Sequence, residues 1–180
     1  MKFEVFDDPD SVARAAAAII AADSRGAAGH EVVDFGAYEL NQGDDYPDFV
    51  TPLARAVAAG TVEQGVGVCG SGVGASVCAN KIRGVRAALV EDHFSTRQGV
   101  EDDHMNIICM GARTVGPLLA WDLVETFLAA EFSQAERHLR RLKKVASLEP
   151  EVVSDGIGAG PHCARRKSVQ ARPDRSRQRS

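Results

Sequence analysis

Residues 65–81 read GVGVCGSGVGASVCANK, and this stretch decides the fold. The short apolar run 65–68 ends abruptly at Cys69 and predicts a strand. Glycines at the alternate positions 70, 72 and 74 predict a tight turn, and the small residues 75–81 predict a helix. A strand that turns through glycines into a helix leaves backbone N–H groups free at a positive helix end. The stretch therefore predicts a place for an anionic oxygen beside a thiol and a hydroxyl.

The segments on either side extend this pattern into alternating strands and helices. Apolar runs predict strands, and amphipathic or alanine-rich stretches predict helices. The expected strands are 2–6, 30–35, 65–68, 87–90 and 106–110, and the expected helices are 11–22, 49–59, 75–81, 94–101, 116–130 and 134–148. This alternation predicts an α/β fold with a parallel sheet covered on both faces. Ligands of such sheets bind at the carboxyl ends of the strands, where the 69–74 loop and the 91–93 and 111–113 turns lie.

The bulk composition is that of a globular protein. The chain has 180 residues, of which 44% are hydrophobic and 26% charged, and its net charge of −4 gives no reason to expect nucleic-acid binding. No apolar run approaches a membrane span, and the first ten residues are too acidic for a signal peptide. The cysteines show neither CxxC nor zinc spacing; they are Cys69, Cys78, Cys109 and Cys163. We expect a cytoplasmic protein with reduced thiols.

The chain changes character after about Glu149. A glycine-rich linker composition at 156–161 precedes a tail with many arginines and almost no apolar residues. Such a tail cannot bury enough surface to order itself. The expected organisation is therefore a domain at 1–149 and a disordered basic tail at 150–180. An inert extension is favoured over a contact with nucleic acid or an anionic surface.

The glycine loop matches neither of two common phosphate-binding motifs. It is not the dinucleotide fingerprint G-x-G-x-x-G, and no Gly-Lys-Ser/Thr follows as a P-loop requires. One interpretation is that the glycines only permit a tight turn. Cys69 favours chemistry instead, because a thiol at a strand end facing a helix N-terminus carries thiolate character and acts as a nucleophile or base. Cys78 and Cys109 lie in apolar runs and are expected to be small core residues.

Several motifs together resemble the ribose-5-phosphate isomerase B family, which includes the galactose-6-phosphate isomerase subunits. The resemblance rests on residues 69–74 and 79–88 and is extended by 30–36, 45–49, 111–113 and 132–141, so it covers nearly all of 1–148. It implies a Rossmann-like three-layer α/β/α sandwich with a five-stranded parallel sheet. It also implies a homodimer or tetramer with composite active sites between subunits.

The resemblance implies an aldose–ketose isomerase that acts on a small sugar phosphate without a metal or organic cofactor. Cys69 matches the general base that moves a proton between C2 and C1 through a cis-enediolate. The backbone N–H groups of 70–74 match the oxyanion donors, and Ser71 matches a hydroxyl near the reacting sugar. Ala75 stands where other members carry a glutamate base, so Cys69 is the only candidate there. Asn80 fits a residue that holds the loop as well as it fits a ligand.

The family's phosphate-binding arginines match Arg113, Arg137 and Arg141. Arg137 and Arg141 are four residues apart and so share one helical face, where two guanidinium groups can converge on a dianion. The alternative is a solvated basic face, since further basic residues lie nearby. The other substrate-binding positions that the resemblance implies are Asp8, Tyr46, Gly70, Gly72, Gly74 and Asp103.

The sequence departs from the family at two histidines. The first strand usually ends in Asp-His; here Asp8 aligns but Pro9 replaces the histidine. Asp102 replaces the histidine that protonates the ring oxygen, and Asp103 replaces the asparagine beside it. His104 takes over as a catalytic group only if the loop is reshaped. A substrate that needs no ring opening, such as a tetrose phosphate, or another sugar phosphate such as a hexose phosphate, is therefore an alternative. A non-catalytic sugar-phosphate binding subunit is another.

Two acidic turns raise the question of a metal. Residues 91–93 and 102–104 each combine carboxylates with an imidazole, and such groups can hold a divalent ion. Exposed acidic turns are far commoner than metal sites. No metal is therefore expected.

Overall fold

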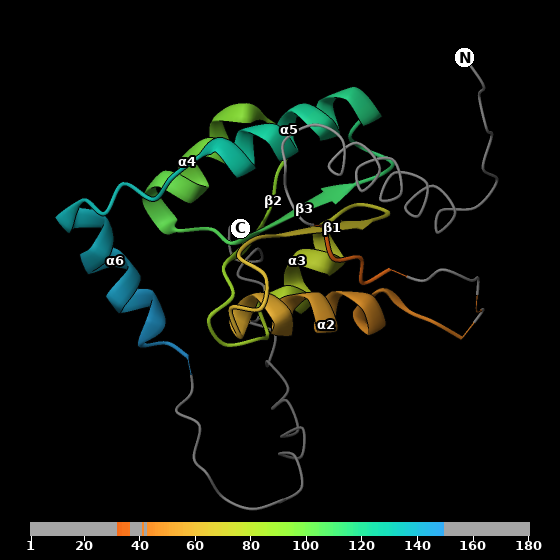
Figure 1. The fold of residues 1–180 in the computed structure, drawn as a ribbon, viewed down its shortest axis with the longest axis horizontal. Helices are drawn as coiled ribbons and strands as arrows, with labels where there is room; N and C mark the ends of the chain where they lie inside the picture. Colours follow the sequence, from red (N-terminus) through yellow and green to blue (C-terminus); the bar gives the residue numbers. More distant parts are fainter. Residues whose placement is uncertain (1–31, 37–40, 42, 150–180) are drawn as a thin grey trace, which may run out of the picture. The chain divides into compact units, whose positions relative to one another are not determined.

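The computed structural model describes residues 32–36, 41 and 43–149. The elements in chain order are α2 (Tyr46–Ala58), β1 (Gly65–Cys69), α3 (Val73–Ala79), β2 (Ala87–Leu89), α4 (His93–Asp103), β3 (Ile107–Gly111), α5 (Pro117–Ala129) and α6 (Glu136–Ala146) (Figure 1). The chain divides into two units after Glu149, and every described residue belongs to the first. None of the helices in this part combines the length and apolar character needed to cross a bilayer.

The three described strands form a parallel sheet in the order β1-β3-β2. Gly65 pairs with Ile107 and Cys69 with Gly111, so β1 and β3 run in register over their full length. β2 pairs with the other side of β3 from Ala87 onward. The expected parallel α/β sheet is thus confirmed for these three strands.

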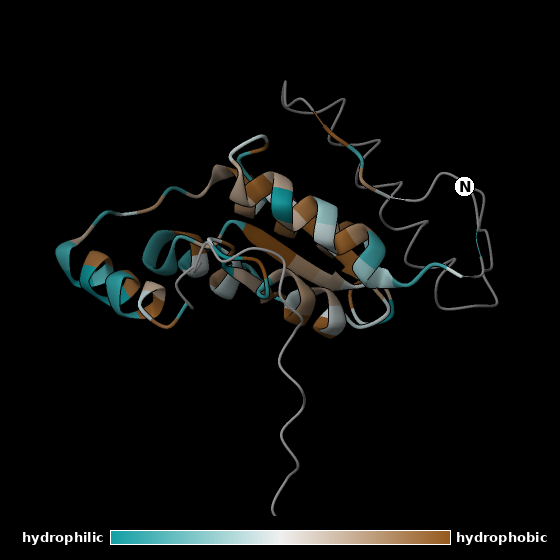
Figure 2. Cartoon of the chain, turned by 90° about the horizontal axis from the view of Figure 1, so that it is seen from below, coloured by the Kyte–Doolittle hydropathy of each residue, from teal (hydrophilic) through white to brown (hydrophobic). Residues whose placement is uncertain are grey.

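Helices cover both faces of this sheet because the side chains of β3 alternate between two cores. Ile107 and Cys109 pack with residues of α2 and α3, whereas Ile108 and Met110 pack with residues of α4 and α5. All five residues of β3 are buried. Figure 2 shows the apolar strands, in brown, between the two helical layers. This arrangement leaves the strand ends and their loops as the places where polar side chains can gather.

The expected number of five strands is not reached among residues 32–36, 41 and 43–149, which contain three. The expected strand 2–6 and helix 11–22 lie outside the described residues. Of the expected strand 30–35, residues 32–35 are described and are not in a strand. The Asp34 side chain accepts the Gly36 N–H at 2.8 Å, which bends the chain locally, and Val33 is 51% exposed.

The helices begin and end within three residues of the expected bounds. The largest difference is at α2, which starts at Tyr46 instead of residue 49. Asp48 accepts the Asp45 N–H at 2.9 Å, and Pro47 lies in the first turn, where its missing N–H costs nothing. Capping chemistry therefore extends this helix toward the glycine loop and places Tyr46 beside it.

Candidate active site

Cys69 is the last residue of β1, and the loop that follows folds back onto its sulfur. The Gly72 N–H donates a hydrogen bond to Cys69 Sγ, with 3.1 Å between nitrogen and sulfur. Gly72 has φ of 76° and caps the N-terminus of α3, a left-handed conformation that glycine adopts without strain. The loop thus places a backbone donor against a half-buried sulfur.

The glycines also allow this loop to lie directly against the end of β3. A Cβ atom at Gly72 would lie 2.5 Å from Leu89 Cδ1 and 2.8 Å from the Met110 carbonyl carbon, and one at Gly111 would lie 2.7 Å from the Ser71 carbonyl carbon. Two hydrogen bonds hold the contact: Ala112 N–H to the Cys69 carbonyl at 2.9 Å, and Arg113 N–H to the Gly70 carbonyl at 3.2 Å. Close packing is therefore one reason for the glycines.

Two further candidate residues lie against the loop at the carboxyl edge of the sheet. The Tyr46 ring packs on Gly74, where a Cβ atom would meet it at 3.0 Å. The Arg113 Nε lies 4.0 Å from the Cβ position of Gly70, and Ser71 is exposed between these neighbours. The structure thus brings one group together: Cys69, Gly70, Ser71, Gly72, Gly74, Tyr46 and Arg113.

The other described cysteines lie in different surroundings. Cys109 in β3 is fully buried, and burial, with smaller contributions from Cys69 and Cys78, raises the pKa of its thiol to about 12. Cys78 is half-buried, and its Sγ lies 3.6 Å from Thr51 Oγ1. Cys109 is thus a neutral core thiol, as expected. Of these three thiols, Cys69 alone lies at the end of a strand in the candidate site.

Asn80 links the helix after the glycine loop to the start of β2. Its amide nitrogen donates to the carbonyl groups of Ser76 and Ala87 at 3.0 and 2.7 Å, and its oxygen accepts the Ala87 N–H at 3.0 Å. Both ends of the amide are therefore engaged by backbone. Asn80 holds the chain between α3 and β2 in place.

His104 connects α4 to β3 at the opposite, amino edge of the sheet. It has φ of 52°, and its ring stacks on Phe132 with 4.7 Å between ring centroids. Its carbonyl accepts the Arg86 Nε–H at 2.6 Å. Partial burial, and secondly the charge of Arg86, lower the pKa of His104. His104 therefore closes the turn between helix and strand.

Asp102, near the end of α4, contacts a histidine that the sequence had not singled out. Its Oδ1 lies 3.2 Å from His138 Nδ1, and its Oδ2 accepts the Gln98 Nε2–H at 3.1 Å. His138 is 1% exposed although α6 is otherwise a charged helix. The one sequence signal was a histidine within the 132–141 motif. Its partner on α4 is remote in sequence, so spacing could not reveal the pair.

The exposed Arg137 and Arg141 both lie on α6 as expected, and Asp103 is exposed at the end of α4. Figure 1 shows α6 beyond the amino ends of the strands, whereas β3 points away from it. The strands β1 and β3 each span about 13 Å over their five residues. Within one chain the structure therefore does not bring Arg137, Arg141 or Asp102 to Cys69. Asp8 lies outside the described residues.

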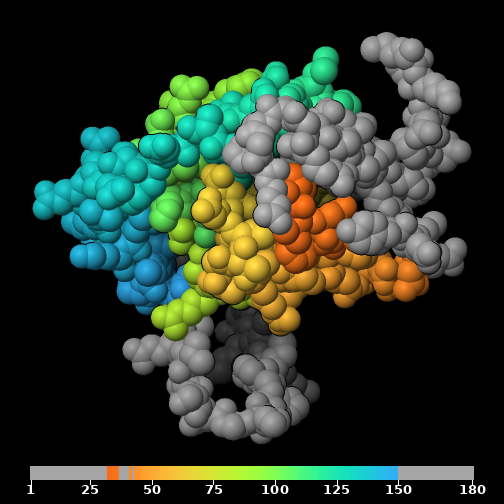
Figure 3. All heavy atoms as spheres, viewed as in Figure 1, coloured from red at the N-terminus to blue at the C-terminus, as the bar shows by residue number. Residues whose placement is uncertain are grey.

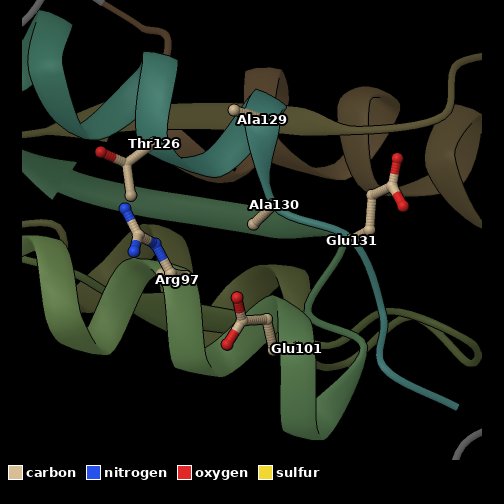
Figure 4. Close-up of a pocket in the computed structure, with 6 residues that line it drawn as sticks. All are labelled: Arg97, Glu101, Thr126, Ala129, Ala130 and Glu131. Carbon is tan, nitrogen blue, oxygen red and sulfur yellow. The ribbon is translucent and has the colours of Figure 1, made fainter.

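A separate cavity lies between α4 and α5 and contains none of these candidates. It has a volume of about 390 Å³ and is lined by Arg97, Glu101, Thr126, Ala129, Ala130 and Glu131 (Figure 4). Its charged lining includes no thiol.

The acidic residues at 91–93 and 102–104 do not come together as a metal site. In the described part of the chain, no three His, Cys, Asp or Glu side chains are placed to hold an ion. Asp92 instead caps α4, where its Oδ1 accepts the Ser95 N–H at 2.8 Å. That hydrogen bond is the main cause that lowers the Asp92 pKa.

Comparison with known proteins gives consistent matches. The model of the ribose/galactose isomerase family matches residues 10–145. A putative sugar phosphate isomerase, YwlF, of Bacillus subtilis is 39% identical over 119 residues, which is 66% of this chain and 79% of that protein. A D-erythrulose-4-phosphate isomerase of Pectobacterium atrosepticum is 35% identical over 104 residues, 58% of this chain and 68% of that one.

A solved structure matches both fold and sequence. The type B ribose 5-phosphate isomerase of Trypanosoma brucei superposes with a TM-score of 0.73 at 37% identity. The match covers 78% of this chain and 94% of that one. The similarity therefore extends far beyond a single motif.

Proposed function

Because the chain belongs to the ribose/galactose isomerase family, we propose that it interconverts the aldose and ketose forms of a small sugar phosphate. Ribose 5-phosphate and ribulose 5-phosphate are the reference pair, as in the type B isomerase that it resembles. The observation that carries the proposal is the Cys69 sulfur at the end of β1, which accepts the Gly72 N–H. A sulfur with a fixed backbone donor, at the carboxyl edge of a parallel sheet, is suited to proton abstraction.

In this proposal, the Cys69 thiolate removes the proton from C2 of the aldose. The electron pair of that C–H bond forms the C1–C2 double bond of a cis-enediolate, and the carbonyl oxygen becomes the oxyanion. The hydroxyl proton of the C2 oxygen then passes to the C1 oxygen. The thiol returns its proton to C1, and the C2 oxygen becomes the ketone. Loop N–H groups and the Ser71 hydroxyl stabilise the oxyanion, each well-placed donor contributing about 3 kcal/mol.

The proposal completes the site with a second copy of the chain. Arg137 and Arg141 of one protomer bind the substrate phosphate beside Cys69, Tyr46 and Arg113 of the other. What supports this is the separation of the two groups by the length of the strands within one chain. Arginines on one helical face can bind a phosphate dianion with parallel N–H donors.

A second candidate is an open-chain substrate, favoured by the partners of Asp102 and His104. Asp102 contacts His138, and the His104 ring stacks on Phe132, so neither is presented as an acid for a sugar ring oxygen. A four-carbon ketose 4-phosphate has its terminal hydroxyl blocked and cannot close a five-membered ring. The similarity to a D-erythrulose-4-phosphate isomerase fits this class of substrate.

The test is a panel of substrates with the purified full-length protein. D-ribose 5-phosphate, D-erythrulose 4-phosphate and D-galactose 6-phosphate are assayed, and kcat/KM is compared. An open-chain enzyme gives its highest kcat/KM with the tetrulose phosphate. Ordinary turnover of ribose 5-phosphate would instead support the reference pair and overturn the open-chain candidate. Binding without turnover of any of them contradicts the catalytic proposal and indicates a binding subunit.

A further inference from the structure

The helix that carries the proposed phosphate arginines is joined to the domain by a buried imidazole. Of the eleven residues of α6, all of which the structure describes, only His138 is buried. The blue residues of this helix form an exposed flank of the described part (Figure 3). His138 lies next in sequence to Arg137, and the two side chains are in direct contact.

The hydrogen bonds of His138 fix where its proton lies. Arg137 Nε lies 2.6 Å from His138 Nε2, and a guanidinium nitrogen can only donate, so Nε2 must be the unprotonated acceptor. The proton of a neutral ring then lies on Nδ1. There it faces Asp102 Oδ1 at 3.2 Å and Ser133 Oγ at 2.9 Å. Both ring nitrogens are thereby satisfied, as a buried imidazole requires.

These contacts form a directed chain from α4 to α6. The Gln98 side chain donates to Asp102, the His138 ring donates to Asp102, and Arg137 donates to the ring. The Ser133 N–H also donates to the Glu101 carbonyl at 3.0 Å, which ties the segment before α6 to α4. Asp102 therefore accepts hydrogen bonds at the α4 end of this series. It stands at the position where the family resemblance places a ring-opening histidine.

We propose that His138 is a positioning residue that holds Arg137 ready for the substrate phosphate, and that Asp102 orients His138. The inference rests on the proposed function, in which Arg137 binds phosphate. With its Nε–H fixed on the imidazole, the exposed guanidinium keeps the N–H donors of its two terminal nitrogens for a dianion. A long side chain that is already ordered loses less conformational entropy on binding.

The first test reads the proton on His138 in the wild-type protein. Nitrogen-15 NMR of the histidine rings distinguishes the Nδ1–H tautomer from the Nε2–H tautomer. At neutral pH the proposal requires the Nδ1–H form for His138. An Nε2–H or doubly protonated ring would overturn the proposal, whatever the behaviour of any variant.

The second test compares variants by affinity for inorganic phosphate and by steady-state kinetics. His138→Leu fills the buried site but removes the acceptor, so the phosphate Kd and the substrate KM rise about tenfold, while kcat changes less than about threefold. His138→Gln supplies an acceptor oxygen and restores most of the affinity. Arg140→Gln, on the same exposed helix, controls for loss of general positive charge.

The outcomes separate this inference from the proposed function. A folded His138→Leu protein with unchanged phosphate Kd and KM overturns the positioning role even if the wild type is an active isomerase. A wild type that turns over none of the sugar phosphates, but whose phosphate affinity still falls in His138→Leu, contradicts the isomerase proposal and supports the positioning role. Circular dichroism and thermal unfolding establish that each variant is folded.

Discussion

At the scale of single residues, Cys69 and Cys109 show how position decides the chemistry of one side chain. They lie on neighbouring strands, where Cys69 pairs with Gly111 and Cys109 with Gly67. Cys109 is surrounded by the core, and burial holds its thiol in the neutral form with a pKa of about 12. Cys69 ends its strand and meets a backbone N–H. The same residue type is therefore inert in one strand and is the proposed base in the next.

A substitution at Gly72 tests how closely the glycine loop must approach β3. An alanine at this position would have to adopt the left-handed φ of 76°, and its Cβ atom would lie 2.8 Å from the Met110 backbone. We expect Gly72→Ala to lower the free energy of unfolding by about 3 kcal/mol, measured by denaturant titration. Gly84→Ala is the matched control, because Gly84 has φ of 83° but nothing within 4 Å of its Cβ position. It should cost only about 1 kcal/mol. Equal costs at the two positions would mean that close packing plays no part.

The residues that the sequence could predict were those of the local pattern. Cys69 and the glycines after it were found because their spacing marks a strand, a turn and a helix start within ten residues. The sequence did not single out His138 as a site residue, because its contact Asp102 lies on a different helix. Contacts between elements far apart in sequence leave no periodic signal in either one.

At the scale of elements, caps and apolar runs explain which segments were predicted. The strands β1, β2 and β3 follow from apolar runs, and all three form. Residues 32–35 are apolar except for Asp34 and are not in a strand, and the Asp34 side chain accepts the Gly36 N–H. Strand formation depends on a neighbouring strand as well as on composition. This dependence limits what a run of valines alone can predict.

The N-cap of α4 makes this helix sensitive to acid. The Ser95 N–H, which donates to Asp92, lowers the pKa of Asp92 below its ordinary value of 3.8. A carboxyl group whose pKa is lower in the folded than in the unfolded protein stabilises the fold at pH values above its ordinary pKa. This stabilisation is lost as the pH falls through the folded-state pKa. We expect Asp92→Ala to lower Tm at pH 7, and the difference from wild type to shrink below about pH 3.8. Thermal unfolding from pH 7 to pH 2.5 measures this.

Asp122→Ala is the control for the capping prediction. Asp122 is an exposed carboxylate within α5 and does not cap a helix, so its removal should leave no acid-dependent difference of this kind. A Tm difference for Asp92→Ala that stays constant down to pH 2.5 would contradict the role of the charged cap.

At the scale of the whole molecule, the proposed site is divided between two ends of the sheet. The thiol and the glycine loop lie at the carboxyl edge, and α6 with its arginines lies beyond the amino edge. Each chain then contributes a thiol to one site and arginines to another. In a dimer with a twofold axis, each protomer supplies the missing half of its partner's site, so both sites are complete.

Mixing two inactive variants tests this division. Cys69→Ala and the double variant Arg137→Ala/Arg141→Ala are each expected to be inactive. After mixing, unfolding and refolding, half of the dimers are mixed and each has one intact site, so activity returns to about a quarter of wild type. Steady-state assays of the mixture and of each variant alone measure it. No recovery from refolded, dimeric mixtures would show that one chain supplies the whole site.

The most direct measurement of the central claim follows the transferred proton. In D₂O, a thiol exchanges its proton with solvent, so wild-type product should carry deuterium at the carbon that receives the proton. We expect Cys69→Ala to lose turnover and deuterium incorporation by about a thousandfold, while the Kd for the sugar phosphate stays near that of wild type. Cys78→Ala, which removes the half-buried thiol beside Thr51, should keep both. A Cys69→Ala protein that still isomerises and incorporates deuterium at the wild-type rate would contradict the account.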